Sequence, residues 1–172
     1  LSIGRDGRID PEEVRELLRP DTVLVAVCAV DSELGTIQPV NEIAALLADH
    51  PNCSLHVDAT QAIGRIPVDF AGIDTLSFAP HKFGGICGSG VLLKRSRMPL
   101  EPQMNGGAST TLYRSGTPAL GLAASSALAL QLACDERESR CAVVQRHSER
   151  LRKALAAYPA VHINSPEHAV PH

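Results

Sequence analysis

The feature that most restricts the fold of this chain is an apolar segment in which polar residues do not alternate with apolar ones. Residues 22–30 (TVLVAVCAV) form this segment, and shorter strand candidates cover residues 53–57, 75–78 and 90–94. A strand of this kind is typical of a parallel sheet that helices cover on both faces. We therefore expect four strands in one sheet, with the first strand buried on both faces.

Helical signals lie between and after these strands. Asp10 and Pro11 read as an N-cap and a first helical position, which predicts a helix over residues 10–19. Residues 39–49 predict a second helix, and residues 119–157 a long helical stretch whose Ala- and Leu-rich first half we expect to be buried. Alternating strands and helices predict an α/β fold with a mostly parallel sheet flanked by helices.

Composition excludes several classes of function. The net charge of −3 and the 3% of aromatic residues do not favour nucleic-acid binding, and no apolar run reaches the ~20 residues of a membrane span. The five cysteines form no C-x-x-C pair, and their odd number argues against a disulfide framework and a zinc site. We expect a cytoplasmic protein without a metal centre.

Three polar residues follow predicted strands: Glu33, Asp58 and Lys82. Ligands of α/β sheets bind beyond the carboxyl ends of the strands, so these residues are candidates for one site. A lysine, a carboxylate at a strand end and a glycine-rich turn are the parts that a pyridoxal phosphate (PLP) site needs. Taken singly, Asp58 could equally cap a turn and Lys82 could be an ordinary surface lysine.

Several segments in this order and spacing, from about residue 1 to residue 164, resemble the NifS-like cysteine desulfurases of the class V aminotransferase superfamily. The matching segments are residues 6–10 (DGRID), 33–39 (ELGTIQP), 56–69 (HVDATQAIGRIPVD), 81–85 (HKFGG), 88–90 (GSG), 106–107 (GG) and 114–117 (RSGT). The resemblance implies the central, incomplete part of the large domain of a fold-type I PLP-dependent transferase.

The resemblance also implies roles for four residues of this chain. Lys82 is similar to the lysine that forms a Schiff base with PLP. Asp58 is similar to the partner of the pyridinium nitrogen, and Gln61 to the donor to the phenolic oxygen of the ring. His81 is similar to a residue that contacts the phosphate.

Two further cofactor contacts are implied at Ser32 and Thr117. Thr117 matches a threonine that reaches the phosphate bound by the other subunit, which implies a homodimer. Ser32 stands where many members have the second of two asparagines, and Asp31 takes the place of the first. Ala79 replaces a serine that often binds phosphate, so one hydroxyl donor is missing.

The implied reaction removes sulfur from L-cysteine and gives L-alanine and an enzyme persulfide for iron–sulfur cluster or thio-cofactor synthesis. The implied partners are a sulfur-acceptor or scaffold protein and a second copy of the chain. Two alternatives remain open: another class V enzyme, such as an aminotransferase or a selenocysteine lyase, and an inactive truncated fragment that lacks the catalytic cysteine.

The same resemblance divides the chain into three parts. Residues 1–118 correspond to the second half of the PLP-binding large domain, and residues 119–158 to a helical stretch toward the small domain. Residues 159–172 correspond to the truncated start of the small domain, with a strand beginning at 161–163. We expect the persulfide cysteine and the arginine for the substrate carboxylate to lie outside this chain, because none of its five cysteines matches the catalytic one.

Overall fold

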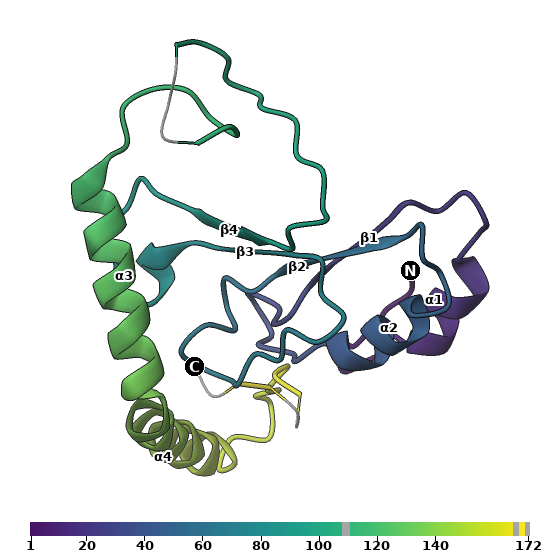
Figure 1. Cartoon of the computed structure of the whole chain (residues 1–172). Coiled ribbons are helices and arrows are strands. Elements are labelled where there is room, and N and C mark those ends of the chain that lie inside the picture. Colours follow the sequence, from purple (N-terminus) through teal and green to yellow (C-terminus); the bar gives the residue numbers. More distant parts are fainter. Residues whose placement is uncertain (108–110, 167–168, 171–172) are drawn as a thin grey trace.

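A four-stranded sheet forms the centre of the protein (Figure 1). The computed structural model describes residues 1–107, 111–166 and 169–170. The strands lie side by side in sequence order: β1 (Leu24–Cys28), β2 (Ser54–Asp58), β3 (Thr75–Phe78) and β4 (Val91–Lys94). The first three are parallel and β4 runs antiparallel to β3. The predicted α/β fold with a mostly parallel sheet is therefore confirmed.

Two short helices precede β1 and β2. Helix α1 (Pro11–Leu17) begins as its sequence predicts, because the Asp10 carboxylate accepts the Glu12 N–H at 2.9 Å. Helix α2 (Val40–Leu47) connects β1 to β2 and buries Ile43 beneath the sheet. Both helices are shorter than the segments that predict them. Helix α1 ends because Leu18 has an extended backbone, with φ −63° and ψ 129°, whereas the residue after α2, Ala48, still has helical dihedrals.

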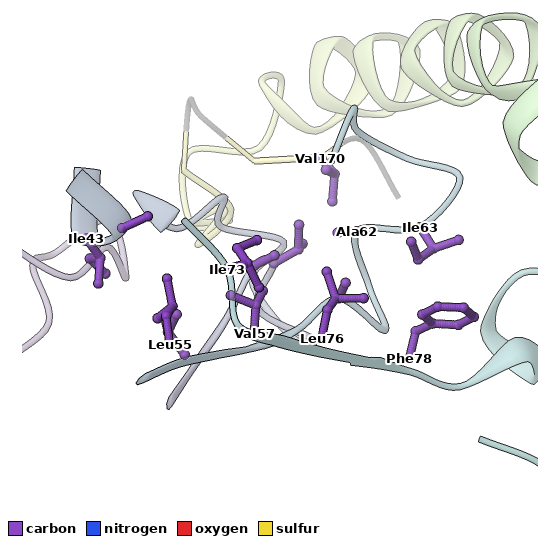
Figure 2. Close-up of a cluster of buried hydrophobic side chains, with 14 of the residues drawn as sticks. Ile43, Leu55, Val57, Ala62, Ile63, Ile73, Leu76, Phe78 and Val170 are labelled. Atoms are coloured by element: carbon purple, nitrogen blue, oxygen red, sulfur yellow. The ribbon is translucent and has the colours of Figure 1, made fainter. Parts of the chain in front are cut away.

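The hydrophobic core lies on one face of the sheet. Figure 2 shows Leu55, Val57, Leu76 and Phe78 projecting from β2 and β3 to the same side. Each of these four is at most 5% exposed. The core also contains Val14, Val27, Ile43, Leu47, Ile63, Ile73 and Val170. Helix α2, loop residues 62–73 and α3 therefore cover this face, and α1 packs against α2 and adds Val14 to the core.

The opposite face of the sheet is largely open among the described residues. Leu24 of β1 and Leu92 of β4 are 55% and 48% exposed there. The prediction that β1 is buried on both faces is wrong for this chain. The physical reason is that both helices before β2 pack on the core side, so the alternate residues of β1 have no cover.

The long helical stretch is divided into α3 (Leu120–Asp135) and α4 (Arg137–Leu155). Glu136 interrupts it, with φ −98° and ψ 4°. The predicted burial of the first half is also wrong, because α3 approaches the rest of the chain mainly through small residues and turns three of its five leucines outward. The buried residues of α3 are Ser126, Ala129 and Ala133, and the exposed leucines are Leu120, Leu128 and Leu132.

The segment after α4 does not begin a strand. Residues 161–163 are irregular, so the strand predicted there is wrong, and the one ladder contact in this region is an isolated bridge between Ala169 and Thr36. Val170 nevertheless reaches the core, where it is 5% exposed. Within the described ranges, no helix combines the length and the apolar character that crossing a bilayer requires.

Candidate active site at the carboxyl edge of the sheet

Asp58 is the last residue of β2 and lies at the carboxyl edge of the parallel strands. It is paired with Ser77 of β3, and the Asp58 carbonyl accepts the Ala29 N–H at 2.8 Å. Its carboxylate is exposed, and Oδ1 accepts the Thr60 N–H at 2.8 Å. One carboxylate oxygen thus caps the turn, and within the described chain Oδ2 has no hydrogen-bond partner. The capping role and a ligand role are compatible at this residue.

Lys82 lies in the turn that directly follows β3. A single 3-10 turn, η1 (Pro80–Lys82), begins two residues after Phe78, and the Lys82 N–H donates to the Ala79 carbonyl at 3.1 Å. The Lys82 side chain is exposed, and none of the described hydrogen bonds or ion pairs engages its ammonium group. Lys94 differs, because its ammonium donates to the Met98 carbonyl at 2.9 Å. The Lys82 amine is therefore available to a ligand.

Arg65 brings the turn that contains Gln61 next to the turn that contains Lys82. One guanidinium nitrogen donates to the Gln61 carbonyl at 3.2 Å and the other donates to the Lys82 carbonyl at 3.5 Å. Burial lowers the pKa of this guanidinium. Gln61 and Lys82 are 21 positions apart, yet a single side chain spans the two. The sequence offered one signal for Arg65, its place inside the segment at 56–69, but assigned it no role.

The glycine turn after Lys82 has no room for a side chain at Gly85 and requires a positive φ at Gly84. A Cβ on Gly85 would lie 2.7 Å from Cβ of Pro80 and 3.0 Å from its carbonyl oxygen. Gly84 has φ +105°, a conformation that favours glycine. These two positions keep the turn compact beside His81, whose exposed ring lies in the same 3-10 turn.

Helix α3 fixes the loop beyond this turn. Ser125 Oγ accepts the Ile86 N–H at 3.1 Å, and the hydroxyl groups of Ser89 and Ser126 lie 3.1 Å apart. Figure 1 shows α3 passing the end of the sheet toward which β3 points. The loop that follows Lys82 is thus attached to a helix rather than free in solvent.

Ser32 and Glu33 lie in the loop after β1, and both are exposed. Asp31 shapes this loop, because its Oδ1 accepts the N–H groups of Glu33 and Leu34 at 2.9 and 2.7 Å. Burial raises the pKa of the neighbouring Cys28 thiol, and the negative charge of Asp31 raises it further. Since β1 and β2 are parallel neighbours, this loop leaves the sheet at the same edge as Asp58.

Thr117 makes no described contact with this group. It lies in the exposed segment just before α3, and no hydrogen bond of the described chain joins it to Lys82, Gln61 or Asp58. The structure thus places five predicted residues at one edge of the sheet, and no described contact joins the sixth to them. The five are Ser32, Asp58, Gln61, His81 and Lys82.

The chemistry of this edge fits PLP. A primary amine with no engaged partner can bond to an aldehyde, and a carboxylate can pair with a pyridinium nitrogen. The amide of Gln61 and the imidazole of His81 supply donors for oxygen atoms of the ring and the phosphate. The glycine turn allows a ligand to approach the backbone closely.

Comparison with known proteins identifies the family of this chain. The sequence matches the Aminotransferase class-V family over residues 1–171, so the chain belongs to this family. It is 38% identical over 169 residues to "NifS/IcsS protein homolog" of Lactobacillus delbrueckii subsp. bulgaricus, which covers 96% of this chain and 44% of that protein. It is 42% identical over 142 residues to "Cysteine desulfurase, mitochondrial" of Arabidopsis thaliana, covering 80% and 31%.

Solved structures show the same fold. The structure titled "Crystal structure of DndA from streptomyces lividans" superimposes with a TM-score of 0.90 at 38% identity, and covers 98% of this chain and 49% of that one. "SspA in complex with cysteine" has a TM-score of 0.71 at 32% identity, and covers 76% and 39%. The chain thus has the fold of part of a NifS-like fold-type I enzyme and spans less than half the length of these proteins.

Proposed function

We propose that this chain contains the lysine-bearing half of the PLP site of a cysteine desulfurase. The observation that carries the proposal is the position of Asp58 and Lys82 at the ends of two adjacent parallel strands, with one guanidinium joining the Lys82 turn to the Gln61 turn. The relatives named cysteine desulfurase match most of the chain. Because the chain spans less than half of their length, the activity of a whole protein is itself part of this proposal.

Each residue has a proposed task. Bound PLP withdraws electrons from the amino acid attached to it. Lys82 holds the cofactor covalently and then, once released, moves the proton at the substrate α-carbon. Asp58 keeps the ring nitrogen protonated, and Gln61 donates its side-chain N–H to the phenolic oxygen. His81 contacts the phosphate, and Ser32 lies near the ring and the substrate.

The substrate that we propose is L-cysteine. Its carbon–sulfur bond breaks, the sulfur passes to a thiol as a persulfide, and the carbon skeleton leaves as L-alanine after protonation. One structure with a similar fold, "SspA in complex with cysteine", supports this substrate class. The persulfide sulfur would then serve iron–sulfur cluster or thio-cofactor synthesis through an acceptor or scaffold protein.

The assembly and location are further proposals. Thr117 is exposed, and we propose that it reaches the phosphate in a second copy of the chain, which is the arrangement of a homodimer. All five cysteines are free, which supports a reducing compartment such as the cytoplasm. We propose residues 1–118 as large-domain sequence, 119–158 as the helical connection and 159–172 as the start of the small domain.

Relatives favour the desulfurase over the other class V reactions, because the curated relatives named above and several others are cysteine desulfurases by name. The isolated 172-residue chain is expected to release no sulfide from L-cysteine. The reason is that we place the persulfide cysteine outside this chain. Of the five cysteines, Cys28 is the one at the edge of the sheet that carries the site, and it is half-buried.

The test is covalent attachment of PLP to Lys82. The chain has three lysines, Lys82, Lys94 and Lys153, so a peptide map distinguishes them. Purified chain is mixed with PLP, reduced with borohydride, digested and analysed by mass spectrometry. We expect the adduct at Lys82 and its loss in the Lys82→Ala variant.

The matched control is Lys153→Ala, which removes an exposed lysine of α4 far along the chain from the site. This variant keeps the adduct at Lys82. Equal labelling of all three lysines, or undiminished labelling of the Lys82→Ala chain, contradicts the assignment of Lys82.

A further inference from the structure

Arg65 is the residue that connects the two turns of the proposed site. Its guanidinium donates to the carbonyl oxygens of Gln61 and Lys82, at 3.2 and 3.5 Å, and no carboxylate of the described chain pairs with it. A guanidinium presents its donors in a rigid planar fork and bridges two acceptors in a fixed geometry, whereas the three donors of an ammonium group rotate on a flexible stem. The side chain is half-buried, and its contact with the Gln61 carbonyl is partly shielded from water, whereas its contact with the Lys82 carbonyl is exposed.

Helices α3 and α4 hold the backbone of Arg65 in place. The Cys141 thiol of α4 donates to the Arg65 carbonyl at 3.3 Å. Gly64 precedes it with φ +75°, and a Cβ there would lie 3.0 Å from Cβ of Ala133 in α3. The guanidinium therefore extends from a backbone that two helices fix, toward two turns that carry proposed cofactor contacts.

We propose that Arg65 is a positioning residue that fixes Lys82 relative to Gln61. This inference rests on the proposed function, because the relative position of the two turns matters for activity only if Lys82 and Gln61 contact the same cofactor. Arg65 does not touch the reacting atoms. It sets where the Lys82 backbone lies, and the amine extends from that backbone toward the cofactor. Displacing a reacting group by about 1 Å can cost on the order of a hundredfold in rate.

The test compares Arg65→Lys with a matched control, Arg95→Lys. Arg95 makes the same kind of bridge away from the site, because its guanidinium donates to the Ile73 and Phe70 carbonyl oxygens, both at 2.7 Å. Each substitution keeps the positive charge and loses the planar fork. The control thus removes two carbonyl contacts without disturbing Gln61 or Lys82.

The first measurement is amide hydrogen exchange of the full chain without PLP. The reporting amides are Lys82 and Phe83, whose N–H groups donate to Ala79 and Pro80. We expect faster exchange in the peptide over residues 79–85 for Arg65→Lys and an unchanged rate there for Arg95→Lys. Exchange that is unchanged in Arg65→Lys, or that rises equally in both variants, overturns the positioning role.

The second measurement is the rate of PLP attachment at Lys82 over a range of pH. We expect Arg65→Lys to slow attachment about tenfold at every pH, with a midpoint of urea unfolding no lower than that of Arg95→Lys. If PLP attachment slows in both variants in proportion to their loss of stability in urea, the inference is contradicted. If the unaltered chain does not attach PLP at Lys82, the proposed function fails, and hydrogen exchange alone decides whether Arg65 fixes the two turns.

Discussion

The carboxylate of Asp31 both shapes its loop and raises the pKa of a neighbouring thiol. Asp31 replaces an asparagine of the resembling family and accepts two backbone N–H groups through Oδ1. An asparagine could accept the same two bonds. What the aspartate adds is negative charge close to Cys28, which raises the pKa of that thiol after burial has already raised it.

We therefore predict that Asp31→Asn lowers the Cys28 pKa while the loop keeps its shape. Lowering a thiol pKa increases the thiolate fraction at any pH below it, and the thiolate is the form that reacts. Alkylation of Cys28 by iodoacetamide at several pH values near 8, followed by mass spectrometry, should be a few-fold faster in the variant. Cys53 is the internal control, because burial and Asp74 raise its pKa. Equal Cys28 rates in both proteins would show that the Asp31 charge does not act on it.

Single residues were predicted well where their chemistry is local. The cap at Asp10 follows from a short sequence pattern, and the structure confirms it. The placement of Asp58 and Lys82 at strand ends follows from the apolar runs before them. Arg65 could not be found in this way, since its two acceptors are carbonyl groups that only the folded chain brings together.

At the level of elements, the contact between α3 and the turn at Gly64 depends on the absence of a side chain. Gly64 has φ +75°, and Ala133 of α3 lies where its Cβ would be, at 3.0 Å. We predict that Gly64→Ala destabilises the chain by about 1–2 kcal/mol from backbone conformation, with a further cost from the crowding against α3.

A double-mutant cycle with Ala133→Gly separates these two costs. Ala133→Gly alone costs about 1 kcal/mol, because glycine weakens a helix interior. The double variant should be less destabilised than the sum of the single variants, since it removes the crowding and leaves only the conformational cost. Urea unfolding of the four proteins measures this. Strict additivity would mean that α3 moves away from the turn at no cost.

The bounds of the elements were predicted closely, except for the division of the long helical stretch into α3 and α4. Strand β3 has the predicted bounds, and β1, β2 and β4 lie within one or two residues of theirs. The break at Glu136 has no glycine or proline to signal it. The outward leucines of α3, such as Leu128, were mistaken for a buried face because an Ala- and Leu-rich pattern does not specify which side packs.

At the scale of the whole molecule, the open face of the sheet governs how the chain behaves in solution. Leu24 and Leu92 lie on this face, and β1 and β4 are the sheet edges within the described chain. Exposed apolar side chains and unpaired strand edges favour association with another chain. We predict concentration-dependent association that is reduced in a Leu24→Lys, Leu92→Ser variant, measured by sedimentation velocity.

The control for this prediction is Leu112→Ser. Leu112 is 89% exposed but lies in the segment before α3 and not on the sheet. This variant removes an equally apolar side chain and should associate as the unaltered protein does. Association that falls equally in both variants would show that total exposed apolar area, rather than the sheet face, drives it.

The strand order has a consequence for synthesis of the chain on the ribosome. Within the described chain, β2, β3 and β4 each pair with the strand made immediately before them, so none of these three waits for a later strand of this chain. Helix α2 is complete before β2 emerges, and the turn bearing Lys82 forms as soon as β3 is in place. These four strands can thus assemble in the order of their synthesis, with the Lys82 turn formed before α3 and α4 are made.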